Sequence, residues 1–185
     1  MMRRAAFCAR MCAAPASVPL PAMESNHIIN ATVENQPAVL SRIVGLFSGR
    51  GYNIDTLNVG PSADPRFSRM TISVPGDEHV LEQVTKQLNK LVDVVKVVDL
   101  TAEAHLEREL VLVEVGIPKG RRGELLEVVS LFHAEVVGVR ESSLTIQFVG
   151  DQSAIDDFLR MLRPYSVLDL SRSGRIAVAR GDVAR

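Results

Sequence analysis

The sequence predicts an α+β fold built from two tandem βαββαβ units, because one pattern of apolar residues occurs twice along the chain. The apolar positions of residues 39–47 recur at helical spacing in 124–132, and the strand-like alternation of 70–77 recurs in 144–151. The offset between the copies falls from 85 to 74, so we expect the second copy to lack eleven residues around 61–67. Two such units, each an antiparallel sheet with helices on one face, form the tandem ferredoxin-like arrangement.

Each element of the first unit has its own signal. Strands are expected where apolar and polar residues alternate, and helices where apolar residues recur every three to four positions. These rules place strands at 27–34, 54–60, 68–74 and 94–100, and helices at 39–50 and 79–91. Gly49 and Gly51 are predicted to stop the first helix, and Asp77 to cap the second. The second unit should run over about 110–178, with Asp151 as the matching cap.

The pattern divides the chain into four parts. They are an N-terminal extension at 1–23, a first domain at 27–101, a charged linker at 102–108 and a second domain at 109–180. The extension is rich in Ala and Pro, carries Arg3, Arg4 and Arg10, and has no acidic residue. It is either a weak organellar transit peptide or a disordered stretch before a true start at Met23. The expected location is therefore cytoplasmic, with an organellar location as the alternative.

Composition narrows the classes of function. A chain of 185 residues with a net charge of −1 offers no general attraction to nucleic acid or anionic lipid, so neither is an expected partner. The central strands contain no aromatic residue that could stack on RNA bases. The two cysteines, Cys8 and Cys12, lie in the extension, and the four histidines share no metal-ligand spacing. We therefore expect no catalytic residue, no metal site and no cofactor in this chain.

One segment invites a ligand. In residues 34–39 a strand ends and a helix begins, with Asn35 placed to cap the helix and Pro37 in its first turn. A helix N-terminus presents unpaired N–H groups and partial positive charge, which suit a carboxylate. Asn53, at the entry to the second strand, could add a side-chain amide. Two plainer alternatives stay open: Asn35 only caps its helix, and Asn53 is an ordinary turn residue.

Several stretches of the chain carry a resemblance to a known family. They are Asn-Gln-Pro-Ala-Val-Leu-Ser-Arg at 35–42, Gly-Leu-Phe-Ser-Gly-Arg-Gly-Tyr-Asn-Ile at 45–54, and the segments 57–59, 68–72 and 87–94. These stretches are similar to the small, regulatory subunit of acetolactate synthase, over roughly 26–181. The resemblance implies an N-terminal ACT domain that binds a branched-chain amino acid, usually valine, across a dimer interface. It also implies a C-terminal ACT-like domain that helps to engage the large catalytic subunit, to which thiamine diphosphate, magnesium and FAD belong.

The resemblance also assigns effector-binding residues. One subunit would offer Asn35, Pro37, Ala38 and Val39, and its partner would offer Asn53 and Ile54. The family usually has glycine in place of Ala38, and the added methyl group is expected to crowd the effector. Dimer formation would partly shield Val59, Ile72 and Val74. The resemblance thus implies a non-catalytic subunit that activates the synthase and conveys feedback inhibition, while the alternative is a stand-alone amino-acid-sensing ACT protein with a different partner.

Overall fold

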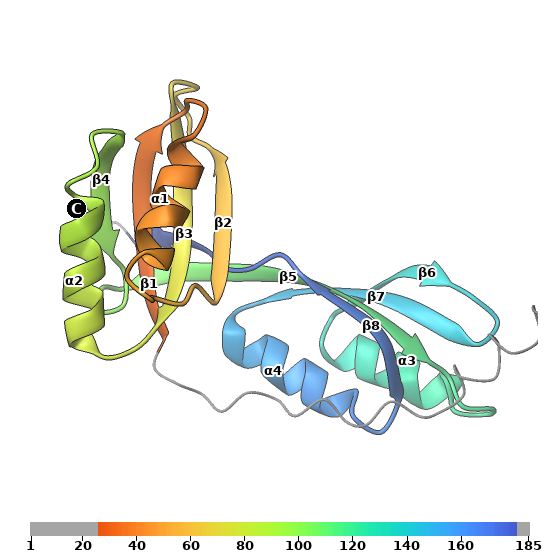
Figure 1. The fold of residues 1–185 in the computed structure, drawn as a ribbon. Coiled ribbons are helices and arrows are strands. Elements are labelled where there is room, and N and C mark those ends of the chain that lie inside the picture. The colour runs from red at the N-terminus through yellow and green to blue at the C-terminus, as the bar shows by residue number, and fades with distance from the viewer. Residues whose placement is uncertain (1–25, 181–185) are drawn as a thin grey trace, which may run out of the picture. The chain divides into compact units, whose positions relative to one another are not determined.

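The computed structural model describes residues 26–180, and the predicted extension at 1–23 lies outside this part of the chain. The first sheet and its helices follow the expected order (Figure 1). They are β1 (Asn26–Glu34), α1 (Val39–Ser48), β2 (Thr56–Pro61), β3 (Phe67–Pro75), α2 (Glu78–Leu88) and β4 (Val94–Asp99). The strands are antiparallel neighbours in the order β2-β3-β1-β4, so the first βαββαβ unit is confirmed.

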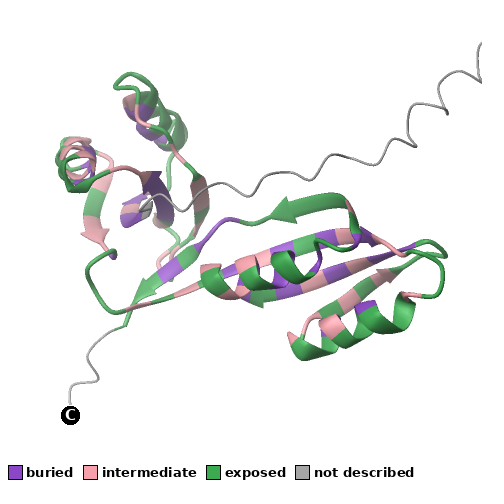
Figure 2. Cartoon of the chain, turned by 90° about the horizontal axis from the view of Figure 1, so that it is seen from below, coloured by how far each residue is buried: buried purple, intermediate pink, exposed green. Residues whose placement is uncertain are grey.

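Alternation along the strands decides which face of this sheet the helices cover. The buried cluster takes alternate strand residues and helix residues spaced three to four apart, and includes Ile29, Ala31, Val33, Val39, Ile43, Phe47, Leu81, Val84 and Leu88. Figure 2 shows the outer faces of the helices exposed. Ile72 and Val74 lie fully buried in the same cluster, so the expectation that a partner subunit shields them is wrong. Val59, on the edge strand β2, is 44% exposed.

The second sheet repeats this order. Its elements are β5 (His105–Gly116), α3 (Arg122–Leu131), β6 (Glu135–Val139), β7 (Ser143–Gly150), α4 (Gln152–Met161) and β8 (Ser166–Arg172). The strand order β6-β7-β5-β8 matches that of the first sheet and confirms the second unit. The rings of Phe132, Phe148 and Phe158 meet with centroids 4.8–5.9 Å apart. A further strand that the sequence did not predict, β9 (Ile176–Ala179), pairs with β5.

The predicted stop and cap residues act as expected. Gly51, just beyond the end of α1, adopts a left-handed φ of 71° that glycine tolerates best. The Asp77 carboxylate accepts a hydrogen bond from the Val80 N–H at 2.9 Å at the start of α2. The Asp151 carboxylate accepts one from the Ala154 N–H, also at 2.9 Å, at the start of α4. Both aspartates therefore satisfy a backbone donor that the helix itself leaves unpaired.

Residues 105–108, which the sequence analysis placed in the linker, form the first part of β5. They pair antiparallel with β9, from His105 opposite Ala179 to Arg108 opposite Ile176. Their backbone hydrogen bonds depend on a partner far downstream, so the charged sequence of the segment itself gives no sign of them. The connection between the two sheets is reduced to residues 100–104.

The extra residues of the first unit are spread over several places, and the expected single missing loop around 61–67 is wrong. The connection from α1 to β2 spans 49–55, whereas 132–134 join α3 to β6. The β2–β3 hairpin turns through 62–66, and the β6–β7 hairpin through 140–142. Matching apolar patterns identify only the shared elements, so they could not locate the insertions between them.

The described residues fall into two compact units that do not coincide with the two repeats. One unit contains 26–111, 149–155 and 171–180, and the other contains 112–148 and 156–170. The unit with the first sheet thus includes residues from after β8. We name residues 173–177 of this unit the covering segment.

The covering segment lies on the helix-free face of the first sheet. The side-chain amide of Asn30 in β1 donates to the Ala177 carbonyl at 2.9 Å, and both residues are buried. Ala177 also packs in a small apolar cluster with Ile28 and Leu100. The helix-free face of the first sheet is therefore closed partly by backbone from far downstream.

Candidate effector site

The β1–α1 turn, residues 35–38, leads directly into Val39, the first residue of α1. No side chain caps this helix, and its first turn carries no acidic residue. The Val39 N–H donates to the Gln36 carbonyl at 3.5 Å, but the amino end of α1 keeps its partial positive charge, which can bind an anion. Val39 is 3% exposed and packs in the first core, so only its backbone is available to a ligand. Pro37 precedes the helix instead of lying in its first turn.

Asn35 does not cap α1, and that prediction is wrong. Its backbone N–H donates to the Arg66 carbonyl at 2.8 Å, and its side-chain nitrogen Nδ2 donates to the Pro65 carbonyl at 3.1 Å. Both acceptors belong to the tip of the β2–β3 hairpin, residues 62–66. Asn35 therefore joins the β1–α1 turn to this hairpin tip.

Ala38 is the residue that precedes α1, and its backbone lies in the left-handed region with φ 70° and ψ −4°. The Arg42 N–H donates to the Ala38 carbonyl at 3.0 Å and closes the first helical turn. A residue with a Cβ atom pays roughly 1–2 kcal/mol in this conformation, whereas glycine adopts it readily. A glycine at this position would therefore suit the left-handed backbone conformation. From the sequence, glycine was expected here only because a ligand approaches closely.

Asn53 and Ile54 lie in the longer α1–β2 connection of the first unit, residues 49–55. The Asn53 amide nitrogen donates to the Asp55 carboxylate at 3.1 Å, and Ile54 packs half-buried against the first core. Within residues 26–180 no hydrogen bond joins Asn53 or Ile54 to the β1–α1 turn. Within the described residues, the two groups of predicted site residues are thus not joined by a hydrogen bond.

The hairpin tip, residues 62–66, was not predicted as part of the site, and its own side chains hold it in place. The Asp64 carboxylate accepts a hydrogen bond from the Arg66 backbone N–H at 3.0 Å and pairs with the Arg66 guanidinium at 2.6 Å. The guanidinium and then the backbone N–H of Arg66 hold the pKa of Asp64 below its ordinary value, and Asp64 in turn raises the pKa of Arg66. The Gly-Pro dipeptide at 60–61 and the Asp-Pro dipeptide at 64–65 were the turn signals for this tip.

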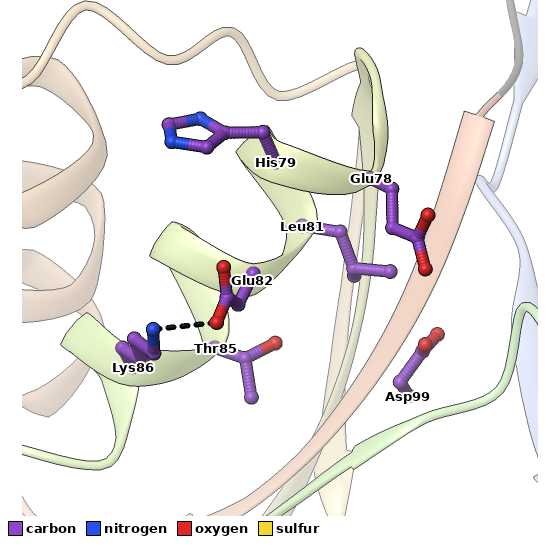
Figure 3. Close-up of a pocket in the computed structure, with 7 residues that line it drawn as sticks. All are labelled: Glu78, His79, Leu81, Glu82, Thr85, Lys86 and Asp99. Atoms are coloured by element: carbon purple, nitrogen blue, oxygen red, sulfur yellow. Dashed lines mark hydrogen bonds and ion pairs between the residues drawn. The ribbon is translucent and has the colours of Figure 1, made fainter.

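A second candidate is an open depression of about 750 Å³ along α2 (Figure 3). It is lined by Glu78, His79, Leu81, Glu82, Thr85, Lys86 and Asp99. Lys86 pairs with Glu82, and Asp99 accepts a hydrogen bond from the Thr101 N–H at 2.8 Å. In the part of the chain that the structure describes, no cluster of three or more His, Cys, Asp or Glu side chains is suited to hold a metal ion. None of the six predicted effector residues lines this depression.

The four-stranded sheet, covered on one face by α1 and α2, has the architecture of a regulatory ACT domain. Residues 29–96 match the model of the AHAS small subunit-like ACT domain, and residues 108–181 match the model described as the small subunit of acetolactate synthase. The chain belongs to the family of acetolactate synthase small subunits. Among residues 26–180 no helix is both long and apolar enough to cross a membrane.

Individual relatives agree with the family match. A probable acetolactate synthase small subunit of Methanothermobacter thermautotrophicus is 46% identical over 84% of this chain and 93% of its own length. The acetolactate synthase isozyme 3 small subunit of Escherichia coli is 43% identical over 84% of this chain and 96% of its own. The crystal structure of the acetolactate synthase small subunit from Thermotoga maritima superimposes with a TM-score of 0.77 at 33% identity, covering 85% of this chain and 99% of that one.

Proposed function

We propose that this chain is the non-catalytic regulatory subunit of an acetolactate synthase. In this role it raises the activity of the large catalytic subunit and conveys feedback inhibition in the biosynthesis of valine, leucine and isoleucine. The observation that carries the proposal is the match of both halves of the chain to small-subunit families. Sequence identity of 43–46% to proteins of that name over 84% of the chain supports it.

The effector is a branched-chain amino acid, with valine as the first candidate. Its α-carboxylate binds at the uncapped start of α1, near Pro37, Ala38 and Val39, where the helix presents partial positive charge and its first turn carries no acidic side chain. Asn35 orients the amino acid from the same subunit, and Asn53 with Ile54 does so from the partner subunit. The proposed site therefore needs a homodimer.

The remaining partner is the large catalytic subunit. Thiamine diphosphate, magnesium and FAD are proposed to reside in that chain, where they supply the carbon–carbon bond chemistry on pyruvate. A cytoplasmic location is proposed for the complex, and the bacterial and archaeal origins of the relatives support it.

A reconstitution assay tests the proposal. Pyruvate is incubated with the purified catalytic subunit, with this chain, and with both, in the presence and absence of valine. We expect no acetolactate from this chain alone, a higher rate from the mixture than from the catalytic subunit, and a lower rate when valine is added. Acetolactate made by this chain alone, or a catalytic subunit indifferent to it, would contradict the proposal.

Variants of the chain locate the effector. Asn35→Ala and Asn53→Ala each remove a side-chain amide from the proposed site, so we expect the valine affinity of either variant to fall about tenfold or more, while activation survives. The matched control is Asn89→Ala, which removes an exposed asparagine whose amide bonds only to the Thr85 carbonyl within α2. Calorimetric titration with valine gives the affinities. If all three variants bind valine like the wild type, the effector binds elsewhere.

A further inference from the structure

The two hairpin tips of the chain are each tied to the start of the preceding helix, but by different side chains. In the first unit the Asn35 amide reaches the Pro65 carbonyl of the β2–β3 tip. In the second unit the Arg122 guanidinium donates to the Arg140 carbonyl at 2.9 Å and to the Glu141 carbonyl at 3.1 Å. A side-chain hydrogen bond thus links each hairpin tip to the segment at the start of the preceding helix, from an asparagine in the first unit and from an arginine in the second.

These two side chains differ in what they leave for a ligand. A carbonyl oxygen only accepts hydrogen bonds, so Nδ2 of Asn35 is the atom that donates to Pro65, and the oxygen Oδ1 of the same amide is left as an acceptor. Within residues 26–180 no hydrogen bond engages that oxygen. A guanidinium has five N–H donors and no acceptor, so Arg122 offers nothing that could accept a hydrogen bond. Of the two side chains that hold a hairpin tip, Asn35 alone therefore presents an acceptor beside a helix N-terminus.

The tip of the first unit is built to hold its position. The Ser62 N–H donates to the Phe67 carbonyl at 3.0 Å, and the Phe67 N–H donates to the Asp64 carbonyl at 3.0 Å. The Asp64–Arg66 pair adds three further contacts between the carboxylate and the guanidinium, at 2.6–3.1 Å. The Pro65 carbonyl that receives the Asn35 amide is thus fixed on both sides.

We propose that the hairpin tip, residues 62–66, is a positioning element of the effector site. It holds the Asn35 amide so that Oδ1 accepts a hydrogen bond from the ammonium group of the bound amino acid, while the start of α1 binds the carboxylate. This inference rests on the function proposed above. It makes recognition of the ammonium group depend on residues that do not touch the ligand.

Two variants and two ligands test the proposal. Asp64→Ala removes the carboxylate that fixes the tip, and a second variant replaces 62–66 with Arg-Glu-Ser, the sequence of the shorter tip at 140–142. The ligands are valine and 3-methyl-2-oxobutanoate, which keeps the carboxylate and the branched chain but lacks the ammonium group. The full chain is titrated calorimetrically with each ligand, and activation of the catalytic subunit reports whether each variant is folded.

We expect the wild type to bind valine about tenfold or more tightly than the oxo acid, because the oxo acid forms no bond to Oδ1. Both variants should lose most of this preference, through weaker binding of valine and unchanged binding of the oxo acid. The matched control is Asp157→Ala, which removes an exposed Asp–Arg pair of 2.7 Å in α4 and should change neither affinity.

The outcomes separate this inference from the function on which it rests. A wild type that binds valine, with variants that keep its affinity and its preference, overturns the inference alone. Equal losses for valine and the oxo acid also overturn it, because the tip would then support the site without orienting Asn35. A wild type that binds no valine contradicts the effector role and the inference together.

Discussion

At Ala38 a single backbone angle decides which side chain is favoured. With φ at 70°, its Cβ atom crowds the following carbonyl oxygen, a contact that glycine avoids. The side chain is exposed and lies outside the first core, so no packing compensates for this strain. The residue that opens the proposed effector site is therefore under conformational strain before any ligand arrives.

Replacing Ala38 with glycine should relieve that strain. We expect Ala38→Gly to raise the free energy of unfolding by about 1 kcal/mol, since the gain in the left-handed region exceeds the entropy that glycine adds to the unfolded chain. Valine affinity should stay the same or increase. Urea denaturation measures the stability.

The matched control for this change is Ala154→Gly in α4, where the same substitution should lower stability by roughly 0.5–1 kcal/mol. If both glycine variants are less stable than the wild type, then the left-handed conformation of Ala38 does not limit stability.

The sequence placed the candidate site on the β1–α1 turn, but the capping role that it predicted for Asn35 is wrong. Capping rules consider only neighbours along the chain, and by those rules an asparagine before a helix is a cap. Its actual partner, Pro65, is brought close by the pairing of β1 with β3, which places Glu34 opposite Phe67. Local rules could not anticipate a partner delivered by strand register.

At the scale of elements, the start of α4 couples helix capping to proton binding. The Ala154 N–H and then the Ser153 hydroxyl donate to the Asp151 carboxylate and hold its pKa below its ordinary value of 3.8. The ionised form is favoured in the folded chain, so its stabilising contribution is complete above the ordinary pKa. That contribution is lost as the pH falls through the lower pKa of the folded state.

A pair of substitutions at Asp151 tests this coupling. Asp151→Asn keeps an acceptor oxygen but does not titrate, whereas Asp151→Ala removes the cap. Near pH 7 the alanine variant should melt below the wild type, and the asparagine variant close to it. As the pH falls to about 3, the wild type should lose stability relative to the asparagine variant. Melting curves that keep a constant separation across this range would show that the Asp151 charge does not contribute.

Helices and strands with a clear periodicity of apolar residues were predictable from the sequence. The strand β9, which depends on pairing with a distant strand, was not. The helices and strands of the first unit begin and end within a few residues of their predicted positions, because each has an apolar face set by its own sequence. β9 has four residues, and one of them, Ala177, is buried. Such a short segment becomes a strand only because β5 supplies its hydrogen bonds.

At the scale of the whole molecule, the covering segment makes the first sheet depend on residues beyond the second repeat. The predicted domain limits at 27–101 and 109–180 follow the repeats, whereas the compact units place 171–180 with the first sheet. Asn58 in β2 also donates to this segment, reaching the Ser173 carbonyl at 3.4 Å. An internal repeat identifies duplicated elements but not the contacts that later link them.

Loss of the buried bond should be costly. Asn30→Ala leaves the buried Ala177 carbonyl without its donor, so we expect a loss of about 1–3 kcal/mol in unfolding free energy and faster amide hydrogen exchange in β9. The control is Asn58→Ala, whose bond to Ser173 is longer and exposed, and which should cost less than half as much. Equal losses of unfolding free energy in the two variants would mean that the buried Asn30–Ala177 hydrogen bond stabilises the fold no more than the exposed Asn58–Ser173 bond.

The covering segment also sets an order of events while the protein is being made. Chains generally fold domain by domain from the amino end as they leave the ribosome. The four strands of the first sheet can pair once β4 has emerged. Ile28, Asn30 and Leu100 contact Ala177, which is synthesised only after β5 to β8 of the second repeat. While the second repeat is being synthesised, the nascent first sheet therefore has one face open to chaperones and to neighbouring nascent chains.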